Sequence, residues 1–226
     1  EIRASHGAGR IGALVSPHST LEELHLAASL VRGLGSENID HRLRHSEFPA
    51  PEGVRWLGTS VASLSELQSV LVVGSNLRKD HPLFAQRIRQ AARHGCAVAA
   101  ITSRALLKTD TAWAMPLRAV QAVEAGDWAQ ALADVATVLA ADKGVPAPVA
   151  GQATDSARAL AGSLQSGERK AILLGNAAAH HAQASVLLAL CQWIGEQTGA
   201  TVGWLTEAAN TVGAQVVHAV PGKGGL

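Results

Sequence analysis

The alternation of short apolar runs with amphipathic helices constrains the fold of this chain most. Residues Val70–Val73 form a continuous apolar run that ends at Gly74, which is typical of a strand covered on both faces in a parallel sheet. Pro82 then stands where the first residue of a helix is expected. Because residues 97–101 form the next apolar run, this segment predicts a βαβ unit.

The alternation extends toward both ends of the chain. Residues 11–15 predict a strand, and Thr20 with Glu23 has the capping-box spacing that begins a helix. Ser63 with Glu66 repeats this spacing and predicts a second, short helix. Four more elements are predicted: a helix from 127 to about 143, a helix over 155–165, a strand over 171–174 and a strand over 202–205.

Strands that alternate with helices predict an α/β fold, with a doubly wound, mainly parallel sheet and helices on both faces. This fold is compatible with two lobes. The sequence Gly-Val-Pro-Ala-Pro at 144–148 interrupts the pattern, so the main joint is predicted at 143–153. It would separate a Rossmann-like lobe, 1–142, from a second α/β portion, 154–226. We expect both ends to be truncated relative to a longer parent protein.

Charge and cysteine content exclude several classes of function. Nineteen Lys and Arg residues against eighteen Asp and Glu residues give a net charge of +1, so no overall field attracts nucleic acid or an anionic membrane. The longest stretch without a formal charge, residues 171–195, is interrupted by polar residues such as Asn176, and we expect no membrane insertion. Cys96 and Cys191 are far apart in apolar segments, which favours a reducing compartment over a disulfide framework.

Ligands of such a sheet are expected where the strands end at their carboxyl edge, because helix N-termini and free backbone N–H groups there favour anions. Two loops at this edge share a pattern: a strand, a glycine, an asparagine and then a histidine. Each asparagine has two possible roles, binding a ligand or bonding within its own loop. With the loop after the last predicted strand, the candidate cleft residues are Gly74, Ser75, Asn76, His81, Gly175, Asn176, His180 and Asn210.

Common catalytic motifs are absent from the sequence. It contains no GxGxxG, GxxxxGK[ST] or GxSxG pattern, so a nicotinamide site, a P-loop or a hydrolase triad has no support. Adjacent residues such as His180 and His181 point about 100° apart on a helix, and no carboxylate or cysteine follows at helical spacing. We therefore expect neither a metal site nor a catalytic residue. Arg87, Arg89 and Arg93 predict the solvent face of a helix, with a docking surface as the alternative.

Two groups of motifs resemble known families. The run Val70–Asn76, followed by His81-Pro82 and by a helix start at Gly126-Asp127, resembles the molybdopterin oxidoreductase domain. The segments Leu14–Glu23 and Leu205–Ala214 are similar to the large iron–sulfur subunit of bacterial proton-pumping NADH:quinone oxidoreductase (complex I). The resemblance covers nearly the whole segment, and its last motif is the most specific.

The chain departs from the molybdenum-containing relatives at two places. Those relatives usually have Asn-Pro where this chain has Asn76-Leu77, and Asp-Pro-Arg where it has Thr102-Ser103-Arg104. The missing carboxylate would accept hydrogen bonds from a nucleotide. The resemblance therefore implies a vestigial cleft without a cofactor in this segment, with [4Fe-4S] and [2Fe-2S] clusters elsewhere in the parent subunit.

The first hypothesis is a noncatalytic scaffold and interaction segment of an NADH dehydrogenase, complex I, which passes electrons from NADH to quinone through clusters outside this segment. Its expected partners are other peripheral-arm subunits, and its expected place is the cytoplasmic face of the bacterial plasma membrane. One alternative is a functional molybdopterin-dinucleotide-binding domain of a molybdenum or tungsten oxidoreductase. Another is a stand-alone nucleotide-binding regulator, for which only the fold argues.

Overall fold

The computed structural model describes residues 1–42, 44–47, 53–107 and 113–225. The chain forms two compact units. The terminal unit combines both ends of the chain, Glu1–Trp56 and Thr206–Leu226, and the sheet unit comprises Leu57–Leu205. Each is described by itself below.

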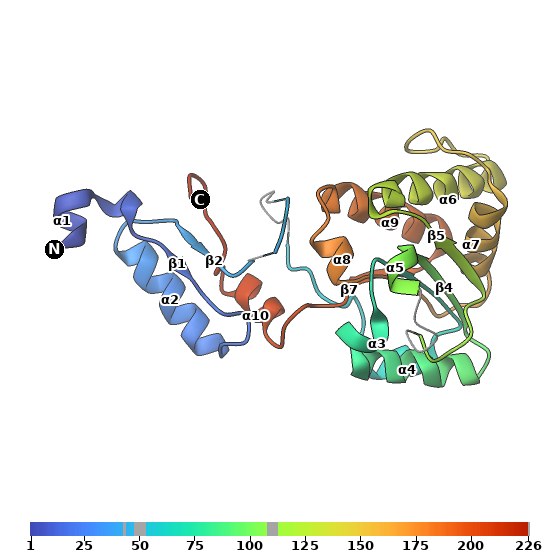
Figure 1. Cartoon of the computed structure of the whole chain (residues 1–226), viewed down its shortest axis with the longest axis horizontal. Coiled ribbons are helices and arrows are strands. Elements are labelled where there is room, and N and C mark those ends of the chain that lie inside the picture. Colours follow the sequence, from blue (N-terminus) through green and yellow to red (C-terminus); the bar gives the residue numbers. More distant parts are fainter. Residues whose placement is uncertain (43, 48–52, 108–112, 226) are drawn as a thin grey trace. The chain divides into compact units, whose positions relative to one another are not determined.

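The sheet unit is built on five parallel strands in the order β5-β4-β3-β6-β7 (Figure 1). This confirms the predicted α/β fold with a parallel sheet and the strands expected near 70–73, 97–101, 171–174 and 202–205. The first strand in this order, β5, was not predicted. The strands are β3 (Ser69–Val73), β4 (Ala97–Thr102), β5 (Ala119–Ala122), β6 (Lys170–Leu174) and β7 (Thr201–Trp204).

Helices cover both faces of this sheet because its central strands are apolar at nearly every position. Leu71 and Val73 of β3 pack in one core with residues of α6, α7 and α9. Val70 and Val72 point to the opposite face and pack with residues of η2 and α4. Figure 1 shows α6 and α9 on one side of the sheet and α4 on the other. The helices named here are η2 (Ala62–Glu66), α4 (Pro82–Arg93), α6 (Trp128–Lys143), α7 (Asp155–Gln165) and α9 (Ala184–Thr198).

Shorter helices follow several of the strands. They are α3 (Leu77–Asp80), α5 (Arg104–Leu107), η3 (Ala125–Asp127) and α8 (Asn176–Ala179). The helix predicted from Ser63 and Glu66 is the 3-10 helix η2, and the predicted capping box is absent because the helix is capped at Val61. Ser63 instead donates its hydroxyl to the carbonyl of Ser60.

The strand order reverses at the pair β3 and β6. From β3 the chain moves to β4 and β5 on one side, whereas β6 pairs with the other side of β3 and leads to β7. In doubly wound sheets, ligands bind outside the carboxyl ends of the strands at this switch point. The loops after β3 and β6 therefore mark the place to look for a site.

The terminal unit contains a two-stranded parallel sheet and helices from both ends of the chain. Thr20 and Glu23 form the predicted capping box at the start of α2, with backbone-to-side-chain distances of 3.3 and 2.9 Å. Leu24, Ala28 and Val31 form one core with Ala214. The elements are α1 (Ile2–His6), η1 (Ala8–Arg10), β1 (Ala13–Leu14), α2 (Leu21–Gly33), β2 (Ile39–Asp40) and α10 (Thr211–Val216).

The predicted joint at 143–153 lies inside the sheet unit, between α6 and α7. Gly144 ends α6 in a left-handed conformation, and the Asp134 side chain accepts a hydrogen bond from the backbone of Gln152. The Gly-Val-Pro-Ala-Pro segment at 144–148 therefore marks the end of helix α6. The observed division depends on long-range contacts, such as those of α10 with α2, that no local pattern contains.

None of the described helices is both long enough and apolar enough to cross a bilayer.

Two glycine-to-alanine substitutions test the packing of the sheet unit. A Cβ at Gly203 in β7 would overlap the backbone carbonyl of Leu57, whereas a Cβ at Gly162 in α7 would meet open space. We expect Gly203→Ala to lower the free energy of unfolding by about 2 kcal/mol or more. The matched Gly162→Ala should raise it by about 0.5–1 kcal/mol, because alanine favours a helix. Urea unfolding followed by circular dichroism gives both values, and an unchanged Gly203→Ala protein would contradict this packing.

Candidate functional site

The loops that follow β3 and β6 lie against each other at the switch point. The backbone N–H of Gly175 donates to the carbonyl of Val73 at 2.8 Å, and that of Ala177 donates to the carbonyl of Gly74 at 3.0 Å. The structure thus brings together six of the predicted residues. These residues, called the switch-point site below, are Gly74, Ser75, Asn76, His81, Gly175 and Asn176.

Both glycines are required by the closeness of this contact. Gly74 has a φ of +60°, in the left-handed region. A Cβ at Gly74 would lie 2.7 Å from Cζ3 of Trp128 and 2.8 Å from the backbone nitrogen of Ala178. A Cβ at Gly175 would overlap the side chain of Ser75. The glycines therefore serve the contact between the loops, which fixes the polar residues beside them.

Four polar atoms of the switch-point site are buried and make no hydrogen bond of good geometry within the described part of the chain. They are Ser75 Oγ, Asn76 Oδ1, His81 Nε2 and Asn176 Oδ1. The side chains of His81 and Asn176 lie close enough to interact with each other, so Ser75 and Asn76 are the residues whose side-chain oxygens lack any partner there. A buried polar atom without a partner costs about 1–3 kcal/mol, so most such atoms in folded proteins are paired with protein, water or ligand. Their gathering at the switch point is the strongest sign of a binding site in the sheet unit.

The backbone of the β3 loop is held without the Asn76 side chain. The backbone N–H of Asn76 donates to Oδ2 of Asp80 at 3.0 Å, and the carbonyl of Asn76 accepts from the N–H groups of Lys79 and Asp80. Of the two roles that the sequence leaves open for this asparagine, binding a ligand therefore fits its unpaired Oδ1 better than bonding within its own loop.

His81 is a buried and neutral member of the site. Only 5% of the residue is exposed, and its ring stacks on Phe84 with the centroids 5.9 Å apart. Burial lowers the pKa of His81 below its ordinary value, although the charge of Asp80 and the nearby Asn176 side chain act in the opposite direction. The site therefore presents a neutral imidazole at neutral pH.

His181 has a structural role next to the site. Its Nδ1 accepts from the backbone N–H of Gln183, so its Nε2 carries the proton and donates to the carbonyl of Ala125, each at 3.0 Å. The ring stacks on Trp128 with the centroids 5.7 Å apart. Because Trp128 also packs on Gly74, this pair links the loops of β3 and β6 to the start of α6.

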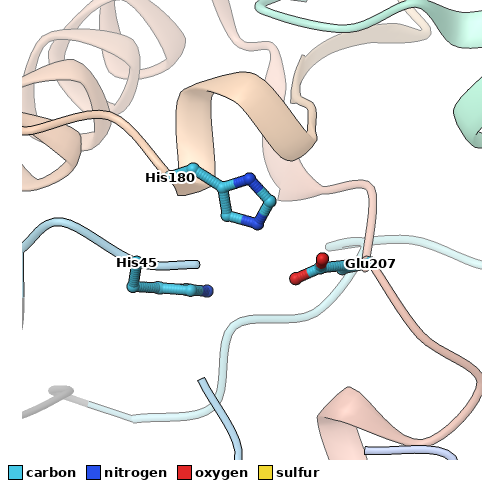
Figure 2. A group of neighbouring side chains, drawn as sticks. All are labelled: His45, His180 and Glu207. Carbon is cyan, nitrogen blue, oxygen red and sulfur yellow. The ribbon is translucent and has the colours of Figure 1, made fainter. Parts of the chain in front are cut away.

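The other two predicted residues lie outside the switch-point site as defined. His180 is the capping residue at the end of α8, and Figure 2 draws it with His45 and Glu207. His45 and Glu207 belong to the terminal unit, whereas His180 belongs to the sheet unit. Glu207 also forms an ion pair with Arg44 at 3.6 Å. We therefore assign no metal site to these three residues. Asn210 also belongs to the terminal unit and precedes α10, with its side chain donating to the carbonyl of Ser19 at 2.9 Å.

Two more residues with a buried polar atom lie near neighbouring strand ends: Thr102, which the sequence singled out only as a departure from the family pattern, and Gln121, which sequence reasoning missed. Thr102, at the end of β4, is fully buried and its Oγ1 has no partner among the described residues. Gln121 of β5 has an unpaired, buried Oε1 as well. Their position at the carboxyl edge is the signal that would have found them, but the strand containing Gln121 was not predicted.

The chemistry of the site is neutral hydrogen bonding. Hydroxyl, amide and imidazole groups make up its polar side chains, and the Asp80 carboxylate beside them accepts from the backbone N–H of Asn76. Ser75 Oγ has no hydrogen-bonded base among the described residues, as nucleophilic catalysis would need. The arrangement is suited to bind and orient a polar ligand.

The lowered pKa of His81 predicts a loss of stability in acid. Below its ordinary pKa of about 6.5 the unfolded chain binds a proton at this position more readily than the folded chain does. The free energy of unfolding should therefore fall as the pH drops from 8 to about 5.5, and fall less in His81→Gln. Urea unfolding of both proteins at pH 8 and at about pH 5.5 measures how much the free energy of unfolding changes with pH. The other histidines are the same in both proteins, so their contributions cancel when the two changes are compared. Identical pH dependence in the two proteins would contradict the burial of a neutral His81.

Residues 1–226 match the sequence model of the molybdopterin oxidoreductase family. This agrees with the resemblance of the strand–glycine–asparagine motifs to that domain.

Curated proteins with similar sequences are oxidoreductases by name. "Probable oxidoreductase YjgC" of Bacillus subtilis (strain 168) is 31% identical over 98 residues, which is 40% of this chain and 10% of that protein. A "Putative formate dehydrogenase" of Staphylococcus aureus (strain USA300) is 29% identical over 97 residues, which is again 40% of this chain and 10% of that protein. "Putative formate dehydrogenase YrhE" of B. subtilis is 28% identical over 102 residues, which is 42% of this chain and 10% of that protein. The matched segment thus covers about a tenth of the length of these relatives, none of which is named as a complex I subunit.

Proposed function

Because the chain belongs to the molybdopterin oxidoreductase family, we propose that its sheet unit is the part of an oxidoreductase that holds the dinucleotide end of a molybdopterin cofactor. The observation that carries this proposal is the group of unpaired, buried polar atoms at the switch point. A dinucleotide offers hydroxyl, phosphate and base groups that supply partners to such atoms. The names of the curated relatives agree with an oxidoreductase as the parent protein.

The residues of the switch-point site fit such a group. Ser75 and the amides of Asn76 and Asn176 would hold its polar edge, since hydroxyl and amide groups both donate and accept. His81 would accept or donate one further bond as a neutral ring. When bound, the metal–pterin end of the cofactor supplies the electron-transfer chemistry. The residues of this chain would orient the cofactor through these hydrogen bonds.

The substrate of the parent protein belongs to the same proposal. Two of the relatives described above carry the name "Putative formate dehydrogenase", which makes a small acid such as formate the candidate substrate. The matched segment covers only about a tenth of the length of those proteins. We therefore propose that the residues of this chain bind the cofactor, and we assign none of them to binding the substrate.

A second candidate is the noncatalytic scaffold of the large iron–sulfur subunit of complex I. Thr102 favours it, because a fully buried threonine ends β4 where molybdenum-containing relatives carry a carboxylate. Leu77, where those relatives have proline, is also fully buried and serves the core. In this case the switch-point site is vestigial, the iron–sulfur clusters lie elsewhere in the parent subunit, and its partners are peripheral-arm subunits on the cytoplasmic face of the plasma membrane.

Metal and pterin analysis of the intact parent protein separates the two candidates. The first predicts stoichiometric molybdenum or tungsten together with a pterin that is released and becomes fluorescent on oxidation. The scaffold predicts iron without molybdenum, tungsten or pterin. Elemental analysis and fluorescence of the same preparation, from cells supplied with both metals, give the answer, and iron alone would contradict the cofactor-binding proposal.

Substitution at the switch point tests which residues hold the cofactor. We expect Asn176→Leu in the parent protein to lower pterin retention by about tenfold, because one lost hydrogen bond to a buried group costs about 1–3 kcal/mol. Gln192→Leu changes the same kind of side chain on the exposed face of α9 and should leave retention unchanged. Equal retention in both variants would remove Asn176 from the site.

A further inference from the structure

Positive charge is concentrated in one segment of an otherwise balanced chain. Residues 77–93, which form α3 and α4, contain five basic residues and one acidic residue, Asp80, whereas the whole chain has a net charge of only +1. The segment therefore produces a local field that attracts anions. The basic residues are Arg78, Lys79, Arg87, Arg89 and Arg93.

A pocket of about 200 Å³ opens beside this segment. Its polar lining comes from Arg78, Gln86, Arg89 and Trp113, and its apolar lining includes Pro82 and Ala85 of α4. None of these residues belongs to the switch-point site. The pocket is smaller than the 300–1,000 Å³ that is usual for large organic ligands, so its occupant is small.

The charged and aromatic groups of this lining can donate hydrogen bonds but cannot accept them. Guanidinium groups only donate, and so does the indole N–H of Trp113. Trp113 is 6% exposed, and its Nε1 is buried without a partner among the described residues. No acidic residue lines the pocket in the described part of the chain. The two guanidinium groups of the lining, those of Arg78 and Arg89, match an oxyanion.

We propose that this pocket binds a small organic carboxylate. The planar guanidinium fork of arginine matches a carboxylate in two parallel hydrogen bonds. The apolar walls from Pro82, Ala85 and the indole ring suit the carbon skeleton of an organic acid better than bare inorganic phosphate. The proposal is independent of the cofactor proposed for the switch-point site.

Titration of the chain with succinate at constant ionic strength tests the proposal. The indole N–H signals in a ¹H–¹⁵N spectrum report binding, and the signal of Trp113 is identified by its loss in Trp113→Phe. We expect saturable movement of that signal with succinate and none with succinamide, which has the same skeleton without charge. Inorganic phosphate should bind more weakly than succinate.

Two arginine variants with the same change of charge provide the control. Arg89→Gln should weaken succinate binding by about tenfold, as expected for the loss of a charge-assisted hydrogen bond. Arg93 is exposed on the same helix, as Arg89 is, but lies outside the pocket, so Arg93→Gln should change succinate binding by less than about twofold, as a screened surface charge does. Both variant proteins are checked for unchanged thermal unfolding.

Several results would overturn the proposal. They are the absence of saturable binding, equal response to succinamide, tighter binding of phosphate, and equal weakening by Arg89→Gln and Arg93→Gln. Tighter binding of an acidic peptide than of succinate would also overturn it, because the carboxylate would then come from a partner protein.

Discussion

The contact between the loops after β3 and β6 is the constraint on which the candidate site depends. Two parallel strands that neighbour each other in the sheet, but are far apart in sequence, end side by side. Glycine at positions 74 and 175 lets their loops touch, with Trp128 packed against the first of them. This contact fixes Ser75, Asn76 and Asn176 in place while leaving the side-chain oxygens of Ser75 and Asn76 without a partner among the described residues.

Unpaired polar atoms give the site its functional meaning. A fold that only needed to pack would fill these positions with apolar side chains, because unpaired polar atoms destabilise a buried region. Either a ligand supplies the missing partners, as we propose for a pterin dinucleotide, or the atoms remain from an ancestor that had one. Both proposals place the parent protein among oxidoreductases of one family. They differ in whether the chain still binds the pterin cofactor.

The sequence predicted most of the sheet because its central strands are continuous apolar runs. The helix over 155–165 was predicted with its observed bounds, and the capping box at Thr20 was confirmed. The edge strand β5 was missed because Ala119–Ala122 is short and only half-buried. The division into units could not be predicted, because it depends on the packing of α10 on α2 across most of the chain.

The same limits apply to the candidate site. Strand ends and turn residues located the loops after β3 and β6, and the switch point between these strands is what brings the loops together. Local patterns did not distinguish Asn76, with its unpaired oxygen, from Asn210, whose side chain bonds to the carbonyl of Ser19. Such a distinction requires the partners of each side chain, which depend on tertiary structure.

A high-resolution cryo-electron microscopy map of the intact parent protein, prepared without added ligand, tests the central claim most directly. We predict density for a bound nucleotide-like group within hydrogen-bonding distance of Ser75 Oγ, Asn76 Oδ1 and Asn176 Oδ1. A well-resolved map in which only water or side chains of the parent protein occupy that space would contradict a retained cofactor.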